Sequence, residues 1–423
     1  RGGAGDRRGQ SGAAVRIAMT VGVAGNTEGL INSVLGEADT GQDFNKVFLS
    51  KSCGKISAGL SLGPNTSAAE VLQSNLGISN KGFEPGNNGF VITERFARES
   101  FGKACFEAHP PLEKPVVRTY LNGQDLTGKK RGMVVIDLYG LDVTQTRDRY
   151  PEIYHWIVDR VKPERDQNRD IKLRENWWLH RRLRTDLRKM LGGLNQYIAT
   201  VETSKHRFFQ FLPADVAPSN LLIAIASEEP SVLGILSSRV HTIWSLSTGG
   251  RLGVGNDPRY NKRQCFETFP FPLLKAEQAI KIGELAKSID NYRKRQQSEY
   301  SDLSLTGIYN VLDKVRSGQH LKGQEKTIYK HGIVSVLREL YDDLDRAVFE
   351  AYGWSDLADI LVGRPGATTP IPDKPADQAE AEEELLMRLV ELNKQRAEEE
   401  SRGIVRWLRP EYQSPDAVQT EVD

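Results

Sequence analysis

The spacing of apolar residues divides the chain into a strand-rich part and a helix-rich part. From about residue 55 to 272, short apolar runs alternate with Gly, Asn and Pro. GFVIT (89–93), MVVID (133–137) and LLIAIA (221–226) are examples, and we expect each to be a strand bounded by turns. One long helix is predicted to interrupt them, roughly over 151–194. The β-branched run AAVRIAMTVGV (13–23) predicts a strand buried on both faces of a mixed sheet.

After residue 272 the period of the pattern changes. Apolar residues recur every three or four positions over 279–292 and again over 333–351, which predicts two amphipathic helices. A Pro-rich linker is expected over 363–378, followed by an acidic helix from about 379 to 402. Residues 1–12 are rich in Gly and Arg and predict an exposed loop. The pattern therefore indicates a mixed α/β fold.

Composition is that of an ordinary globular protein of several domains. The chain has 423 residues, 39% hydrophobic and 27% charged. Lys and Arg number 57 against 56 for Asp and Glu, but the charges are unevenly spread. Residues 160–189 hold eleven basic against five acidic side chains, and residues 373–423 hold seven against fourteen. A basic segment beside a strand-rich module is typical of nucleic-acid-binding proteins.

Three widely spaced cysteines, Cys53, Cys105 and Cys265, exclude a disulfide scaffold or zinc ribbon and favour a reducing compartment. No run of 18 apolar residues is present, so no membrane span is predicted. The chain begins with Arg and lacks an apolar signal core. We expect it to be the downstream part of a longer protein.

The strongest basic segment contains Arg181, Arg182 and Arg184 and is predicted to be helical. Its guanidinium groups would neutralise DNA phosphates, the main source of nucleic-acid affinity, with Trp177 and Trp178 anchoring the helix or lying near the bound strand. The alternative is a solvated helix with internal ion pairs and two packing tryptophans.

A second candidate, Lys205-His206-Arg207, precedes two phenylalanines. If this segment is a strand, alternation sends Lys205 and Arg207 to one face and His206 to the other. Two cations on one face suit phosphate contact or bidentate recognition of guanine. A structural role, with His206 bonded in a turn, is the alternative.

Two further segments supply the remaining candidates for DNA binding. Arg239 precedes a glycine-rich run containing Arg251, and because that run lacks the order of a nucleotide loop, we favour a turn near DNA or a plain hairpin. Arg259, Asn261 and Lys262 lie on a loop, where arginine suits guanine and asparagine suits adenine. We expect Arg207, Arg259 and Asn261 to read bases.

Catalytic signatures are missing from the sequence. HExxH, GxSxG and P-loop motifs do not occur, and no metal site is predicted. Asp170-Ile171-Lys172 and Asp137 are the residue types of a metal-dependent nuclease, but that chemistry requires its lysine on a buried strand. Lys172 lies instead in a highly charged stretch, which disfavours a nuclease.

The order of several motifs resembles the C-terminal half of MmeI-type (type IIL) restriction–modification proteins, which are adenine-specific DNA methyltransferases. The resemblance is collinear from about residue 13 to 415. The matching segments are AAVRIAMTVG (13–22), NLGISNKGF (75–83), RTYLNGQDL (118–126), VKPERDQNR (161–169), ENWW (175–178), SKHRFF (204–209), LSSRVHTIW (236–244), DPRYNKRQCFETFPFP (257–272), AYGW (351–354) and WLRPEYQ (407–413).

This resemblance implies methyl transfer from S-adenosylmethionine to a flipped adenine in double-stranded DNA. The chain lacks the glycine-rich cofactor loop and the Asn/Asp-Pro-Pro-Tyr/Phe motif of that chemistry. We therefore assign no catalytic or cofactor-binding residue here and expect the chain alone to be inactive. The cofactor site, and in many members a nuclease domain, would lie upstream on the same polypeptide. The resemblance also implies a protein of the bacterial cytoplasm.

The resemblance also implies a division into domains. Residues 1–55 are expected to end a Rossmann-like methyltransferase sheet, and residues 56–272 to form an α+β target-recognition domain. A helical domain over 273–362, the linker over 363–378 and an acidic helix and tail over 379–423 complete the chain. The expected function is DNA sequence recognition for adenine methylation, in restriction–modification or phage defence. The alternative is a standalone DNA-specificity subunit that docks a separate methyltransferase.

Overall fold

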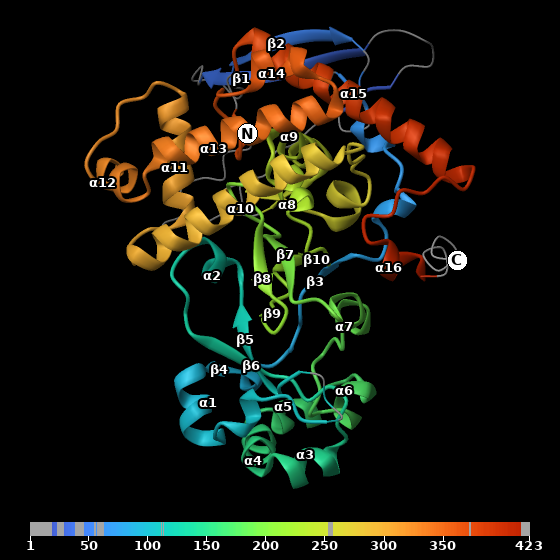
Figure 1. The fold of residues 1–423 in the computed structure, drawn as a ribbon, viewed down its shortest axis with the longest axis vertical. Helices are drawn as coiled ribbons and strands as arrows, with labels where there is room; N and C mark the ends of the chain where they lie inside the picture. Colours follow the sequence, from blue (N-terminus) through green and yellow to red (C-terminus); the bar gives the residue numbers. More distant parts are fainter. Residues whose placement is uncertain are drawn as a thin grey trace.

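The computed structural model describes residues 19–22, 29–38, 46–54, 56, 63–110, 112, 114–252, 257–371 and 374–415. It confirms the mixed α/β class: two four-stranded sheets occupy one part of the molecule and long helices cover the other (Figure 1). Short 3-10 turns η1 (Thr66–Ala68), η2 (Gln73–Asn75), η3 (Asn88–Phe90) and η4 (Ala104–Phe106) connect elements in the sheet region.

The outer sheet has the order β4-β6-β5-β9, formed by Val91–Thr93, Met133–Ile136, Val117–Leu121 and Ala217–Pro218. Strand β6 pairs antiparallel with β4 and β5, whereas β5 and β9 are parallel. The predicted MVVID strand is confirmed in β6, whose last three residues are buried. Helices α1 (Glu94–Phe101), α3 (Val143–Arg149) and α4 (Pro151–Arg160) lie at the outer end of the molecule (Figure 1).

The central sheet has the order β3-β10-β7-β8, formed by Ser79–Lys81, Leu222–Ile225, Gln196–Val201 and Gln210–Pro213. All its pairings are antiparallel. All four residues of β10 are buried, which explains its uninterrupted apolar sequence. Helix α2 (Gly123–Thr127), capped by Asn122, lies between β5 and the central sheet.

The single long helix predicted over 151–194 is wrong. The segment contains four short helices: α4, α5 (Lys162–Asp166), α6 (Ile171–Glu175) and α7 (Thr185–Leu191). Between α6 and α7 the backbone N–H groups of Arg181 and Arg182 donate to the carbonyls of Pro85 and Glu84, so they are unavailable to a helix. Arg184, at φ 53°, is left-handed and precedes α7.

Two helices replace predicted strand-and-turn structure before residue 272. They are α8 (Pro230–Ser237) and α9 (Arg239–Thr248), which are almost entirely buried. Helix α8 is mostly apolar, and α9 buries polar residues among its apolar ones, so neither separates a polar face from an apolar face, which explains the error. Within the glycine-rich run, residues 250–252 form β11 (Gly250–Leu252), which pairs antiparallel with β12 (Asp257–Arg259), the pairing of the hairpin that one alternative expected. A π-helical turn η5 (Lys262–Phe266) follows.

Both amphipathic helices predicted after residue 272 are confirmed, as α10 (Ala276–Glu299) and α13 (Val334–Tyr352). Helices α11 (Leu305–Arg316), α12 (Gln324–His331) and α14 (Ser355–Leu361) pack beside them. The acidic helix is α15 (Ala376–Ser401), followed by α16 (Pro410–Gln413). Through Glu400, α15 accepts hydrogen bonds from the N–H groups of Gln73 and Ser74, so it is joined to the sheet region.

The Pro-rich segment is partly buried and bonded to the rest of the protein. Thr368 is 2% exposed, and its carbonyl accepts a 2.7 Å hydrogen bond from the N–H of Arg207.

At the other end of the chain, β1 (Gly29–Ala38) and β2 (Lys46–Gly54) form an antiparallel, mostly exposed hairpin. The strand predicted over 13–23 is wrong for 19–22, which form no strand and expose Met19 and Val21 almost fully; its other residues, and the predicted loop 1–12, lie outside the described part.

Candidate nucleic-acid interface

The basic segment after α6 places two arginines at the surface. Arg181 and Arg182 are exposed, while Arg184 is half-buried. Glu84 lies between Arg181 and Arg184, at 3.5 and 3.4 Å. A carboxylate therefore offsets part of the positive charge of this segment, which is not the helix that the sequence predicted.

The two neighbouring tryptophans are structural anchors. Trp177 is 7% exposed, and the indole N–H of Trp178 donates to the carbonyl of Leu141 at 2.9 Å. His180 is buried nearby, and its Nε2 lies 2.8 Å from the carbonyl of Ile136. Of the two roles considered for the tryptophans, the structure favours anchoring. The segment that they anchor is a turn, and not the predicted helix.

Residues 205–209 do not form a strand. Lys205 is exposed, whereas His206 and Arg207 are both buried, so the expected alternation of faces does not occur. His206 bonds Thr368 and Asn310, and Lys205 donates to the same Asn310 side chain at 2.5 Å. Burial lowers the pKa of His206 to about 4, so its ring is neutral near pH 7.

Arg207 is enclosed by protein acceptors. Its guanidinium donates to the hydroxyl of Thr200 at 3.1 Å, to the carbonyl of Pro258 at 3.2 Å, and to the carbonyl of Val201. The ring of Tyr260 lies 5.0 Å away. Burial lowers the pKa of Arg207 to about 10. With 3% of the residue exposed, Arg207 cannot reach a base edge without unpacking, so the geometry gives it a structural role.

Arg239 is similarly placed in the interior. It is 1% exposed, its backbone N–H donates to Asp345 at 2.7 Å, and its guanidinium donates to the carbonyls of Arg364 and Pro365. These bonds join α9 to the helical region and to the Pro-rich segment. The arrangement is structural, and it does not present Arg239 to DNA.

The β11–β12 hairpin and the residues after it hold the accessible candidates. Arg251 is exposed on β11. Arg259, with 41% of its side chain exposed, contacts Glu202 through Nε at 2.9 Å and Nη2 at 2.8 Å. Lys81 lies 2.7 Å from the same carboxylate, which is 9% exposed. A buried carboxylate thus holds two basic side chains at the surface, and this ion cluster was missed because its members are far apart in sequence.

Asn261 and Lys262 lie beside this cluster. The Asn261 side chain is exposed and accepts a hydrogen bond from the N–H of Arg263 at 3.0 Å, which caps η5. Lys262 contacts Glu267 at 2.9 Å and the carbonyl of Ser79 at 3.2 Å. Lys81, Arg259 and Lys262 therefore meet near β3, although 181 residues separate the first from the last in the sequence.

Sequence reasoning also missed the loop Gly128–Gly132, between α2 and β6. Lys129, Lys130 and Arg131 are exposed on it, and Arg131 pairs with Asp125 at 2.8 Å. The available signal was a run of three basic residues between glycines, although the surrounding residues 118–142 hold only four basic against three acidic side chains.

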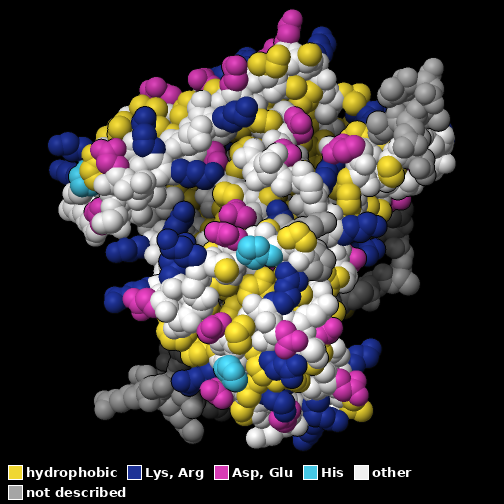
Figure 2. Space-filling view, turned by 60° about the horizontal axis from the view of Figure 1, so that its bottom comes forward, with side chains coloured by type: hydrophobic (Ala, Val, Ile, Leu, Met, Phe, Trp, Pro, Cys, Tyr) yellow, Lys and Arg dark blue, Asp and Glu magenta, His cyan; other side chains and the backbone are white. Residues whose placement is uncertain are grey.

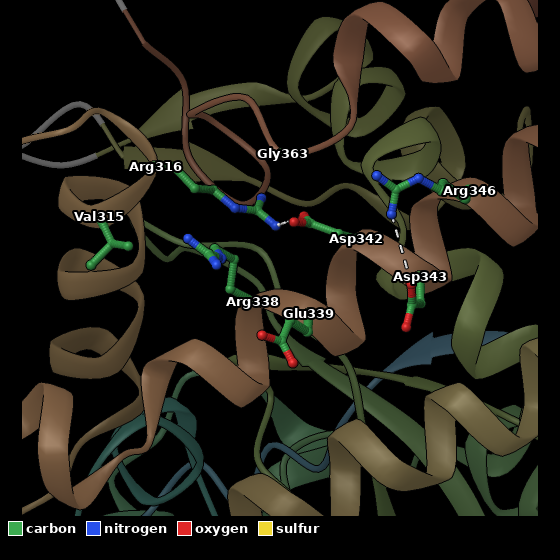
Figure 3. A pocket seen from close by; sticks show the side chains of 8 residues that line it. All are labelled: Val315, Arg316, Arg338, Glu339, Asp342, Asp343, Arg346 and Gly363. Carbon is green, nitrogen blue, oxygen red and sulfur yellow. Dashed lines mark hydrogen bonds and ion pairs between the residues drawn. The ribbon is translucent and has the colours of Figure 1, made fainter.

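Charge alone does not define the interface. Figure 2 shows basic and acidic side chains interspersed over one face of the molecule. A pocket of about 400 Å³ between α11 and α13 illustrates the same balance (Figure 3). Arg316 pairs there with Asp342, and Arg346 lies 3.7 Å from Asp343. Because these charges compensate one another, the pocket is a poor site for a phosphate.

Other site types find no support in the part of the chain that the structure describes. No group of three or more His, Cys, Asp or Glu side chains there is arranged to hold a metal ion. No described helix combines the length and apolar character needed to cross a membrane.

Comparison with known proteins places the sheet region in the class of target recognition domains. Residues 73–273 match the family model described as MmeI, target recognition domain. Residues 73–273 are therefore similar to the MmeI target recognition domain, and the resemblance inferred from the sequence motifs is confirmed. The matched range largely coincides with the domain predicted over 56–272.

A solved structure and a curated protein extend this comparison. The structure of the type IIL restriction–modification enzyme MmeI in complex with DNA matches with a TM-score of 0.57 and 19% identity, covering 84% of this chain and 40% of that chain. DNA methyltransferase A of Bacillus subtilis (strain 168) is 35% identical over 104 residues, which are 24% of this chain and 12% of that protein. The chain therefore corresponds to less than half the length of either relative.

Proposed function

We propose that residues 73–273 recognise a specific sequence in double-stranded DNA and direct methylation of that sequence by the protein to which this chain belongs. The match to the target recognition domain carries the proposal. The related solved protein was captured with DNA, and the relative from Bacillus subtilis is called a DNA methyltransferase. Both names support the same assignment.

The contact geometry of Arg259 supports base recognition. Its Nε and one Nη bind Glu202, which fixes the plane of the guanidinium while 41% of the side chain stays exposed. An arginine held in this way loses little side-chain freedom when it donates two parallel hydrogen bonds to guanine. Among the three predicted base-reading residues, Arg259 and the exposed Asn261 remain candidates, and Arg207 does not.

The methyl-transfer step is assigned elsewhere in the protein. We propose adenine as the methylated base and S-adenosylmethionine as the donor, in keeping with the resemblance. The described residues do not fit the cofactor, because β1 and β2 form an isolated antiparallel hairpin and no described glycine-rich loop joins a parallel strand to a helix. The division of the chain at residues 55, 272, 362 and 378 remains part of this proposal.

Selection of DNA from a random library tests the proposal. The 423-residue chain is incubated with duplexes containing a randomised segment, and the bound fraction is sequenced. We expect one enriched sequence, and we expect Arg259→Ala to lose discrimination at one base pair, at a cost of about 1–3 kcal/mol. Exposed Arg147, which pairs with Asp148 on α3, provides the control Arg147→Ala. Absence of any enriched sequence for the unmodified chain would contradict the proposal.

A further inference from the structure

A polar groove opens between the two sheets of the target recognition domain. Its volume is about 440 Å³, and its walls come from the loop after β3, the start of β4, the ends of β5 and β9, the loop before β6, and α5. One acidic side chain, Glu164 of α5, lines the groove and accepts a hydrogen bond from Nδ2 of Asn87. The polar side chains that matter here are Asn88, Tyr120, Asn122, Arg131 and Asn220. None of them was singled out from the sequence.

Arg131 is held rigidly at the edge of this groove. Its Nε and Nη2 donate to the two carboxylate oxygens of Asp125 at 3.1 and 2.8 Å, and the Asp125 side chain is 1% exposed. The N–H groups of Asn122 and Arg131 also donate to Asp125, at 2.9 and 2.8 Å. No described residue accepts from Nη1 of Arg131. The outward edge, formed by Nη1 and the second hydrogen of Nη2, is therefore the edge left for a ligand.

The amides of the groove have complementary capacities. Asn122 uses its Oδ1 to cap α2, accepting from the N–H groups of Gln124 and Asp125, and so has only its Nδ2 donor left. The side chains of Asn88 and Asn220 form no hydrogen bond with other described residues and keep both donor and acceptor. An amide with both groups available can pair with N6 and N7 of adenine.

The groove adjoins two of the surface arginines described above, Arg259 and Arg181. The carbonyl of Leu221, which lines the groove, accepts a 2.8 Å hydrogen bond from the N–H of Glu202, the residue that holds Arg259. On the opposite side, Gly86 approaches Arg181 so closely that a Cβ there would lie 2.4 Å from that of Arg181. Arg259 thus adjoins the groove through Glu202 and Leu221, and Arg181 adjoins it through Gly86.

We propose that this groove is a second base-reading site of the domain, in which Arg131 donates in parallel to O6 and N7 of guanine. Asn88 and Asn220 provide adenine-compatible amides beside it. Lys129 and Lys130, on the same loop, contact the adjacent phosphates. The inference rests on the proposed function, because it requires duplex DNA to lie along the target recognition domain.

Arg131→Lys and Arg131→Ala test the proposal by random-library selection and fluorescence anisotropy on the 423-residue chain. Lysine keeps the charge and a contact to Asp125 but loses the two parallel donors. We expect both variants to lose a guanine preference at one position and to bind the selected sequence about 5- to 150-fold more weakly, with little change for an unrelated duplex. Lys129→Ala with Lys130→Ala should weaken binding to all duplexes alike.

Arg388→Ala is the matched control. Arg388 also forms a two-point contact with a carboxylate, through Nη1 and Nη2 to Asp356 at 3.0 and 2.7 Å, but it lies on α15, at the opposite end of the molecule (Figure 1). If Arg131→Ala proves misfolded by circular dichroism, Arg131→Lys decides. The inference is overturned if the unmodified chain enriches a sequence and Arg131→Lys enriches it unchanged with equal affinity. If the unmodified chain enriches nothing, the proposed function itself fails.

Discussion

Arginines in two regions of the molecule differ in how many of their guanidinium donors are bonded to protein groups and how many stay exposed. At the surface of the target recognition domain, Arg131 and Arg259 are each held from behind by a buried carboxylate and keep an exposed edge. Where this domain meets the helices, Arg207 and Arg293 are surrounded by carbonyls, hydroxyls and rings. The residue type is the same, but only the first arrangement leaves donors for a ligand. Accessible donors, and not positive charge alone, mark the candidate interface.

The largest effect should come from removing an interior arginine. Arg293 of α10 donates to the carbonyl of Phe209 at 2.5 Å and to the hydroxyl of Tyr309 at 2.8 Å, and it lies 3.3 Å from the buried Asp290. Arg293→Ala leaves that carboxylate without one of its cationic partners, so we expect a loss of about 3–5 kcal/mol in the free energy of unfolding. Urea denaturation measures it. Arg295→Ala, at an exposed position of the same helix, is the control, and equal losses in the two variants would contradict the comparison.

Arg207→Ala sharpens the same contrast, because the sequence favoured Arg207 as a reader of guanine. Removal of its side chain leaves the carbonyls of Val201 and Pro258 without this donor, and we expect stability to fall by about 1–3 kcal/mol. The DNA sequence enriched from a random library should stay the same. Arg259→Ala should behave in the opposite way, with altered selection and nearly unchanged stability. A changed base preference in a folded Arg207→Ala protein would remove the distinction between the two regions.

The sequence predicted elements where a period or an uninterrupted apolar run was clear. Strands β6 and β10 and helices α10 and α13 were found in this way. Helices α8 and α9 were missed, because both are buried on nearly all faces and neither has the separate polar face that marks an amphipathic helix. The broken helix near Arg181 was missed because its cause is a pairing with Glu84 and Pro85, almost a hundred residues earlier.

The candidate site was predicted only in part, for a related reason. Arg259, Asn261 and Lys262 were identified from residue type, and the structure leaves all three at least partly exposed. Whether an arginine is exposed depends on partners distant in sequence, as Glu202 is from Arg259 and Thr368 is from Arg207. One sequence without these contacts could not separate the surface arginines from the interior ones.

The smallest expected effect concerns the basic segment before α7. It tests whether exposed arginines that no buried carboxylate positions contact only phosphates. Arg181 and Arg182 are exposed, whereas Arg184 is half-buried against Glu84. Replacing all three with Ala should weaken binding to every duplex alike. It should also flatten the slope of log affinity against log salt concentration by about 0.9 for each phosphate that the variant no longer neutralises. Since the Arg184 side chain is only 22% exposed, against 54% for Arg181, Arg181→Ala with Arg182→Ala should reproduce most of that change.

Anisotropy titrations between about 50 and 200 mM salt, on both the enriched duplex and an unrelated one, measure this slope. Arg388→Ala again serves as the control, because it removes an arginine at the protein surface far from the groove. Phosphate contacts carry no base information, so the enriched sequence should not change in the triple variant. An unaltered slope would show that these arginines are ordinary solvated surface residues, and a changed base preference would show that Arg181 or Arg182 belongs with Arg131 and Arg259 among the base-reading residues.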